Sequence, residues 1–194
     1  MPTNPANKVK FGLKNVHYAP ITSTEAGKVT YGTPVPIPGA VSLNLTAQGE
    51  MSKFYADNTA YYVSASNDGY QGDLEVALLP DSFATDILKD TLDGTAKVLV
   101  ESAAVETVPF ALLFEFDGDK HNTLHVLYNC TASRPAVASG TTTNTKDPKT
   151  TTLALTAAPL ADGKVKGKST ADTPEDVVTN WYKTVWQPAA VGGP

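Results

Sequence analysis

The chain has 194 residues, of which 41% are hydrophobic and 18% charged, and its formal net charge at pH 7 is −5. This length favours one domain with appendages, or a stretched sandwich, over two full domains. Only Arg134 among the 15 basic residues is an arginine, so the clustered lysine and arginine of proteins that bind nucleic-acid phosphates are missing. The run of Lys164, Lys166 and Lys168 alternates with other residues, which is typical of a solvated strand or turn face.

The N-terminus and the single cysteine bear on the cellular compartment in which the protein folds. Residues 1–11 contain two prolines and two lysines but no apolar run, so they do not resemble a secretory signal. No stretch reaches the roughly 18 apolar residues that a membrane span needs. Cys130 has no second cysteine to pair with in the chain, so the core must hold without a disulfide. We therefore expect a protein made and folded in the cytoplasm, without a membrane partner.

Apolar and polar residues alternate in the N-terminal half, which predicts strands. Residues 1–8 form a predicted polar N-terminal arm and 9–18 a half-buried strand, followed by a proline-rich connector at 32–39. The next strand, 41–46, places three residues on the core face: Val41, Leu43 and Leu45.

A long projecting hairpin is predicted over about 47–70. Its arms turn near Asp57-Asn58, and Asn67-Asp68-Gly69 is a second turn signal. The following strand, 73–79, alternates again. Its core face is predicted to hold Leu74, Val76 and Leu78, and the opposite face Asp73, Glu75 and Ala77.

One flanking helix is predicted at about 81–90. Asp81 or Ser82 is the expected N-cap, and a buried face at helical spacing follows, made of Phe83, Ile87 and Leu88. Further strands are predicted at 97–101, 108–116, 124–129 and 153–155, with Asp117-Gly118 as the turn between the second and third. The threonine-rich segment 139–152 is expected to be a surface loop. These elements give a β-sandwich domain over 9–170.

The last segment, 171–194, is a predicted C-terminal arm. Thr173 is the expected cap of a helical start with Pro174 at its first position and two acids behind it. Both tryptophans of the chain lie in this arm. Trp181, Tyr182 and Trp186 would contact either a neighbouring subunit or their own subunit.

The sequence gives no specific reason to expect an enzyme. His121 and His125 are four residues apart near Asp117 and Asp119, but no further ligands complete a metal shell or a calcium loop. The acids at Asp73/Glu75 and Glu115/Asp117 are spaced as on any solvated strand face. No nucleophile-elbow or phosphate-loop pattern occurs. We expect no catalytic residue, no metal and no cofactor.

Aromatic residues instead concentrate where the chain leaves the predicted core. Five lie on the hairpin, and three lie on the C-terminal arm. Exposed large aromatics are costly unless something covers them, and tyrosine and tryptophan dominate subunit contacts. The pattern favours assembly contacts over a return of both segments onto their own sandwich. The hairpin aromatics are Phe54, Tyr55, Tyr61, Tyr62 and Tyr70.

Over nearly its whole length the chain resembles the major tail proteins, or tail-tube proteins, of long-tailed non-contractile phages and prophages of Gram-positive bacteria. The order and spacing of several stretches carry the resemblance, together with the helix after Pro80-Asp81. They are FGLKNVHY (11–18), IPGAV (37–41), YQGDLEV (70–76) and FALLFE (110–115).

This resemblance implies a mainly β, tail-tube-type sandwich with one helix, a long hairpin and two arms. It also implies hexameric rings stacked into a virion tail tube that conducts DNA without binding it specifically. Expected partners are other copies of the chain, a tape-measure protein, and tail-terminator or distal tail proteins. We expect Phe54, Tyr55, Tyr61 and Tyr62 to stack rings.

Alternation on strand 73–79 leads to a second expectation, that Asp73 and Glu75 face the lumen. Two other functions stay open. A secreted or surface β-sandwich adhesin would share the threonine-rich composition but calls for a secretion signal. A carbohydrate-binding or carbohydrate-acting module would use exposed aromatics as a sugar platform on a monomer.

Overall fold

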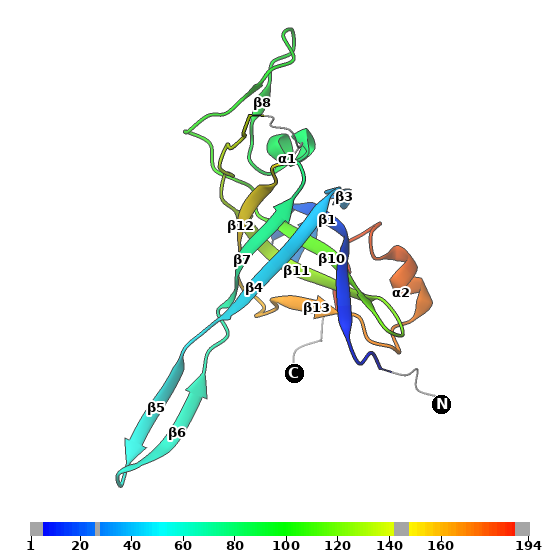
Figure 1. The fold of residues 1–194 in the computed structure, drawn as a ribbon. Coiled ribbons are helices and arrows are strands. Elements are labelled where there is room, and N and C mark those ends of the chain that lie inside the picture. Colours follow the sequence, from blue (N-terminus) through cyan, green and yellow to red (C-terminus); the bar gives the residue numbers. More distant parts are fainter. Residues whose placement is uncertain (1–5, 26–27, 142–147, 189–194) are drawn as a thin grey trace.

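The computed structural model describes residues 6–25, 28–141 and 148–188 (Figure 1). The fold is mainly β, with one large antiparallel sheet, two small two-stranded sheets and two short helices. In the large sheet the order is β2 (Lys28–Tyr31), β1 (Lys10–Glu25), β10 (Phe110–Gly118), β11 (Thr123–Ala132), β12 (Thr151–Ala157), β7 (Gly69–Val76) and β4 (Ala40–Gln48). Two short strands join it: β13 (Lys166–Lys168) pairs with β11, and β3 (Val35–Pro36) pairs with β1.

The sheet folds over itself into a sandwich-type arrangement. In Figure 1, β4 and β7 cross in front of β10 and β11. The main core lies between these layers: Leu74, Leu153 and Leu155 come from one side, and Tyr18 and Leu112 from the other. The predicted alternation on β7 is confirmed for Leu74 and Val76, which are both fully buried.

Strand β10 is buried on both faces. Phe110, Leu112 and Phe114 enter the main core, whereas Ala111 and Leu113 enter a second cluster on the opposite side. The C-terminal segment covers that second cluster, so β10 forms the middle of three layers. This explains why its sequence is continuously apolar, since a strand covered on both faces has no solvated side.

The helices begin near the predicted positions but are capped differently. Helix α1 (Asp81–Asp86) ends earlier than the predicted 81–90, yet Phe83, Ile87 and Leu88 are buried as expected. Its N-cap is Pro80, with no side-chain hydrogen bond, so the predicted cap at Asp81 or Ser82 was wrong.

Helix α2 (Glu175–Asn180), in the C-terminal segment, also lacks a side-chain cap. The Thr173 hydroxyl accepts a hydrogen bond from the Thr170 amide 2.8 Å away, outside the helix. Thr173 is therefore not the cap that the sequence predicted, and Pro174 occupies that position. None of the helices in the described part of the chain is long and apolar enough to cross a membrane.

Three predicted strand details were wrong because tertiary pairing overrides local pattern. A register shift between Ala40 and Ser42 leaves Val41 52% exposed and off the core face. Strand β7 ends at Val76, so Leu78 is 74% exposed. Gly118 pairs with Lys10 as the last residue of β10, and the turn falls at 119–122 instead of Asp117-Gly118.

Two predicted segments differ in extent. The strand at 97–101 shrinks to β9 (Leu99–Val100), which pairs with β8 (Thr91–Leu92). In the threonine-rich segment, 139–141 and 148–150 have no regular structure and β12 begins at Thr151, whereas 142–147 lie outside the described residues. Parts of the predicted arms, 1–5 and 189–194, also lie outside them.

We expect the free energy of unfolding to fall as pH drops from about 6.5 toward 4, because folded His125 resists protonation. Its ring stacks on Phe114 with centroids 5.0 Å apart. Burial, and then the positive charges of Lys168, Lys166 and Lys10, lower the pKa of His125 from 6.5 to about 4. The unfolded chain takes up this proton at higher pH than the folded chain, so His125 favours folding above 6.5 and loses that effect below it.

Urea unfolding of the wild type and of His125→Phe at several pH values measures this contribution. The variant should lose less stability between pH 7 and pH 4, since carboxylate titration is common to both proteins. Parallel curves over that range would contradict the prediction.

Candidate functional site

The predicted hairpin exists and is built by a tight turn. Strands β5 (Met51–Ala56) and β6 (Thr59–Ala65) pair with each other and with no other strand of the described segments. Asp57 and Asn58 join them with positive φ values of 50° and 59°. Positive φ at both central residues is the geometry of a type I′ turn, which suits a two-residue hairpin loop and tolerates Asp and Asn. The hairpin extends away from the sandwich in Figure 1.

This hairpin carries large side chains that its own chain leaves uncovered. The four residues expected to stack rings are each at least 61% exposed: Phe54, Tyr55, Tyr61 and Tyr62. Met51 and Val63 on the same hairpin are exposed as well. An isolated two-stranded hairpin is marginally stable in water, so this segment becomes more stable when another surface covers its exposed side chains. Tyr70, at its base, is half-buried.

The outer face of the β4–β7–β12 layer is polar and acidic. Cross-strand pairing sets three rows on this face, centred on β7: Ser42–Glu75–Thr152, Asn44–Asp73–Ala154 and Thr46–Gln71–Thr156. These nine positions hold two acids and no basic residue. Asp73 is exposed, and Glu75 is half-buried opposite the core residues of β7.

Hydrogen bonds hold Glu75 in its charged form. Thr150 donates to one carboxylate oxygen at 2.6 Å, and Ser42 donates to the other at 3.0 Å. These two bonds, in that order, lower the pKa of Glu75. The face therefore keeps a fixed negative charge at neutral pH.

The same layer has margins that can accept another strand. β4 is the terminal strand of the sheet order and hydrogen-bonds along one edge to β7. At the other margin, β12 pairs with β11 through Leu155–Ala157, and the Ser133 amide also donates to the Ala154 carbonyl at 3.0 Å. Residues 151–153 lie beyond this pairing. Unpaired strand edges are templates for pairing with another chain.

The C-terminal aromatics divide between buried and exposed positions. Trp181 is 2% exposed and belongs to the second core cluster, with its ring nitrogen 3.4 Å from the carbonyl oxygen of His125. Trp186 stacks against it at a centroid distance of 6.2 Å and is 38% exposed. Of the two positions left open for Trp181, packing on its own subunit is the one the structure has.

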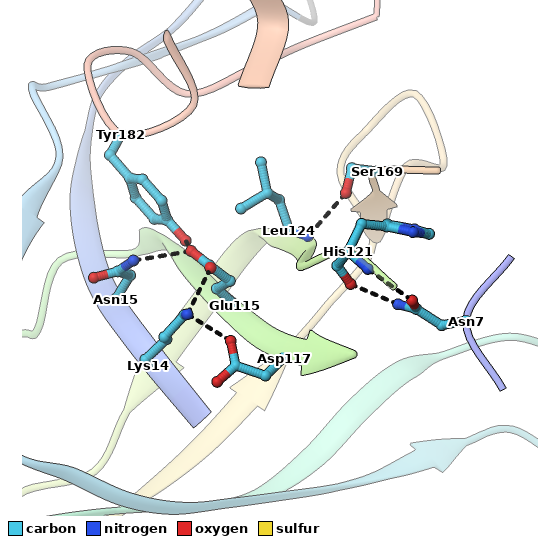
Figure 2. Close-up of polar contacts among 9 residues, drawn as sticks. All are labelled: Asn7, Lys14, Asn15, Glu115, Asp117, His121, Leu124, Ser169 and Tyr182. Carbon is cyan, nitrogen blue, oxygen red and sulfur yellow. Dashed lines mark hydrogen bonds and ion pairs between the residues drawn. The ribbon is translucent and has the colours of Figure 1, made fainter. Parts of the chain in front are cut away.

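Tyr182 fastens the C-terminal segment to a buried carboxylate (Figure 2). Its hydroxyl donates to Glu115 at 3.2 Å, and its ring lies 4.6 Å from that of His17. Lys14 and Asn15 also reach the Glu115 carboxylate, at 3.4 and 2.9 Å. Burial, and then the Glu115 charge and hydrogen bond, raise the pKa of Tyr182. This cluster joins β1, β10 and the C-terminal segment. Spacing along the chain does not reveal it, because Asn15 and Glu115 are 100 residues apart and Tyr182 and Glu115 are 67 apart.

A hollow of about 600 Å³ lies beside this cluster. Its polar groups serve as ties within the chain: Glu115 and Tyr182 bind each other, and Ser169 accepts a hydrogen bond from the Leu124 amide at 2.8 Å (Figure 2). His121 is held through its backbone by Asn7. Among the described residues no group of three or more His, Cys, Asp or Glu side chains could hold a metal ion.

Comparison with known proteins identifies no family, because no protein-family model and no curated protein matches the chain.

Proposed function

We propose that this chain is a structural virion protein that assembles into hexameric rings stacked into a phage tail tube. The observation that carries the proposal is the projecting hairpin (Figure 1), on which four aromatic side chains are each at least 61% exposed. A stacked assembly covers these side chains, and burying exposed aromatics at a subunit contact is favourable. The resemblance supplies the ring size and the virion tail as location.

Ring closure follows from the margins of the β4–β7–β12 layer. In the proposal, the edge of β4 in one copy pairs with the free margin of β12 in the next copy. Two different surfaces then meet, and such head-to-tail interfaces generate rings when the rotation closes. The closed ring covers the outer edge of β4 and the partly paired margin of β12.

The polar face of this layer would line the lumen. Asp73 and Glu75 lie on it without a lysine or arginine among the nine positions of its rows. A negatively charged wall repels phosphates, so DNA passes without being held. A tape-measure protein, and tail-terminator or distal tail proteins, are the further partners in this proposal.

Solution size and negative-stain microscopy of the purified protein test the proposal. We expect rings or tubes whose formation depends on protein concentration. A cryo-EM map of the tubes should place Asp73 and Glu75 on the inner wall, and a map with both on the exterior would contradict the lumen assignment. A protein that stays monomeric and binds glycans would instead favour a carbohydrate-binding module.

A further inference from the structure

A lysine-rimmed opening lies at the end of the molecule from which the hairpin projects. Two adjoining hollows of about 190 and 250 Å³ form it and share Lys10, Phe116 and His125. The floor is apolar and includes Leu43 and Leu45 of β4. The rim holds four exposed lysines from two segments: Lys8, Lys10, Lys166 and Lys168.

Two of the ammonium groups of this rim contact aromatic rings, and one carboxylate, that of Asp119, accepts hydrogen bonds from the backbone amides of Lys8 and Val9. Lys10 lies over the Phe116 ring at 5.2 Å, and Lys166 lies 4.5 Å over the Tyr70 ring while donating to its hydroxyl at 2.7 Å. No ion pair joins any of the four rim lysines to a carboxylate among the described residues. In a chain of net charge −5 this opening is a local positive site, and it suits a partner that brings carboxylates and apolar side chains together.

The loop at 91–107 has that chemistry and lies at the opposite end of the molecule. In Figure 1 it extends beyond α1, away from β13 and the hairpin. Its apolar residues Leu92, Val98, Val100 and Val105 are each at least 43% exposed. It also carries three exposed acids, Asp93, Glu101 and Glu106, against one lysine, Lys97. Glu101 forms an ion pair with Arg134 at 3.2 Å, so the cross-linking test uses Glu106.

We infer that the 91–107 loop of one copy docks into the lysine-rimmed opening of a second copy. The inference rests on the proposed function and names the surfaces that meet when one ring stacks on the next. Loop acids face the rim ammonium groups, and loop valines and leucine cover the apolar floor. Opposite ends of identical subunits then join, which gives the stack one direction. Nucleic acid fits less well, because a phosphate backbone brings charge without apolar side chains for the floor.

Cross-linking between two full-length variants tests this contact. Glu106→Cys and Lys166→Cys are purified separately, mixed and oxidised. We expect a disulfide-linked dimer in which mass spectrometry finds the 106–166 linkage. Cys130 is fully buried and does not compete. Lys183→Cys replaces Lys166→Cys in the control mixture, which should give no 106–183 linkage.

A charge exchange adds a reversible test. Among the described residues, neither Lys168 nor Glu106 takes part in a side-chain hydrogen bond or an ion pair, so substitution at these exposed sites removes no bond that holds the fold. Lys168→Glu should raise the protein concentration needed for assembly at least tenfold, and adding Glu106→Lys in the same chain should restore it. Lys28→Glu makes the same charge change on β2 and should have no such effect. An equal loss in the Lys28→Glu control, or no rescue, would overturn the inference.

The outcomes separate this inference from the proposed function. Tubes that form without a 106–166 linkage overturn the docking contact and leave the tail-tube proposal standing. A 106–166 linkage in a protein that forms chains or pairs but no tubes keeps the docking contact and contradicts the tail tube. If neither tubes nor the linkage form, and the opening binds DNA in a manner that Lys168→Glu abolishes, both proposals fail.

Discussion

Replacing Tyr61 and Tyr62 together by alanine should raise the concentration at which rings or tubes form by at least tenfold, with little change in the melting temperature of the monomer. Both rings are more than half exposed, so their removal costs the isolated subunit little. In an assembly, by contrast, tyrosines at the centre of an interface each contribute about 2 kcal/mol or more. A tenfold change corresponds to about 1.4 kcal/mol, so the predicted effect is a lower bound.

The hairpin register allows contact and hairpin stability to be separated. Phe54 pairs with Tyr62 and Tyr55 with Ala60, so a bulge leaves Tyr61 without a cross-strand partner. Tyr61→Ala alone should therefore weaken assembly without loosening the hairpin, whereas Tyr62→Ala also removes an aromatic cross-strand pair.

Sedimentation velocity and electron microscopy across a concentration series measure this effect. Val137→Ala is the matched control, because Val137 is fully exposed and lies outside the hairpin. If tubes of the double variant kept the length and stability of the wild type, the assignment of the hairpin to ring stacking would be wrong.

Trp181→Ala should destabilise the monomer itself by about 3–5 kcal/mol, the usual cost of removing a buried tryptophan or phenylalanine side chain. Trp181 closes the second core cluster, where it packs on the outer side of β10 and β11. Its removal leaves a cavity that the short C-terminal segment cannot refill. The segment should then separate from the sheet and expose Ala111, Leu113 and Val126 to water.

Urea unfolding and amide hydrogen exchange report the two parts of this prediction. The free energy of unfolding should fall, and the amides of 175–188 should lose their protection before the sheet does. Trp186→Ala is the control, since Trp186 is 38% exposed and its stacking contributes only about 1 kcal/mol. A Trp181→Ala monomer of unchanged stability that failed to assemble would instead make this side chain an inter-subunit contact.

Much of the fold could be predicted from alternation and turn chemistry. The hairpin turn at Asp57-Asn58 is local, and β7 alternates without interruption from Asp73 to Val76, so both were predicted correctly. The positions of β-bulges could not be predicted in this way, because a register shift depends on the partner strand. The exposed position of Val41 follows from such a shift against β7, and nothing in the residues around it signals the change.

The candidate surfaces were predictable only in part, for a related reason. The hairpin could be predicted as a contact surface without tertiary information, because its turn signal and its aromatic residues are both local features of the sequence. The Glu115 cluster and the lysine-rimmed opening assemble side chains from distant strands, so spacing along the chain does not reveal them. Lys166 and Lys168 were predicted to lie on a solvated face, but their position beside Lys10 emerges only when β13 pairs with β11.

The pairing of β1 with β10 also sets the order of events during synthesis. Lys14 pairs with Glu115, so the central layer cannot close until the chain has grown past that residue. The hairpin needs only neighbouring residues and can form long before, as does the pairing of β4 with β7. Non-local pairing is slow, and unpaired edges meanwhile attract other chains. Each nascent chain therefore exposes the aromatic hairpin and the unpaired edge of β4 before its core has formed. We expect premature association to be favoured most between neighbouring nascent chains on one polysome.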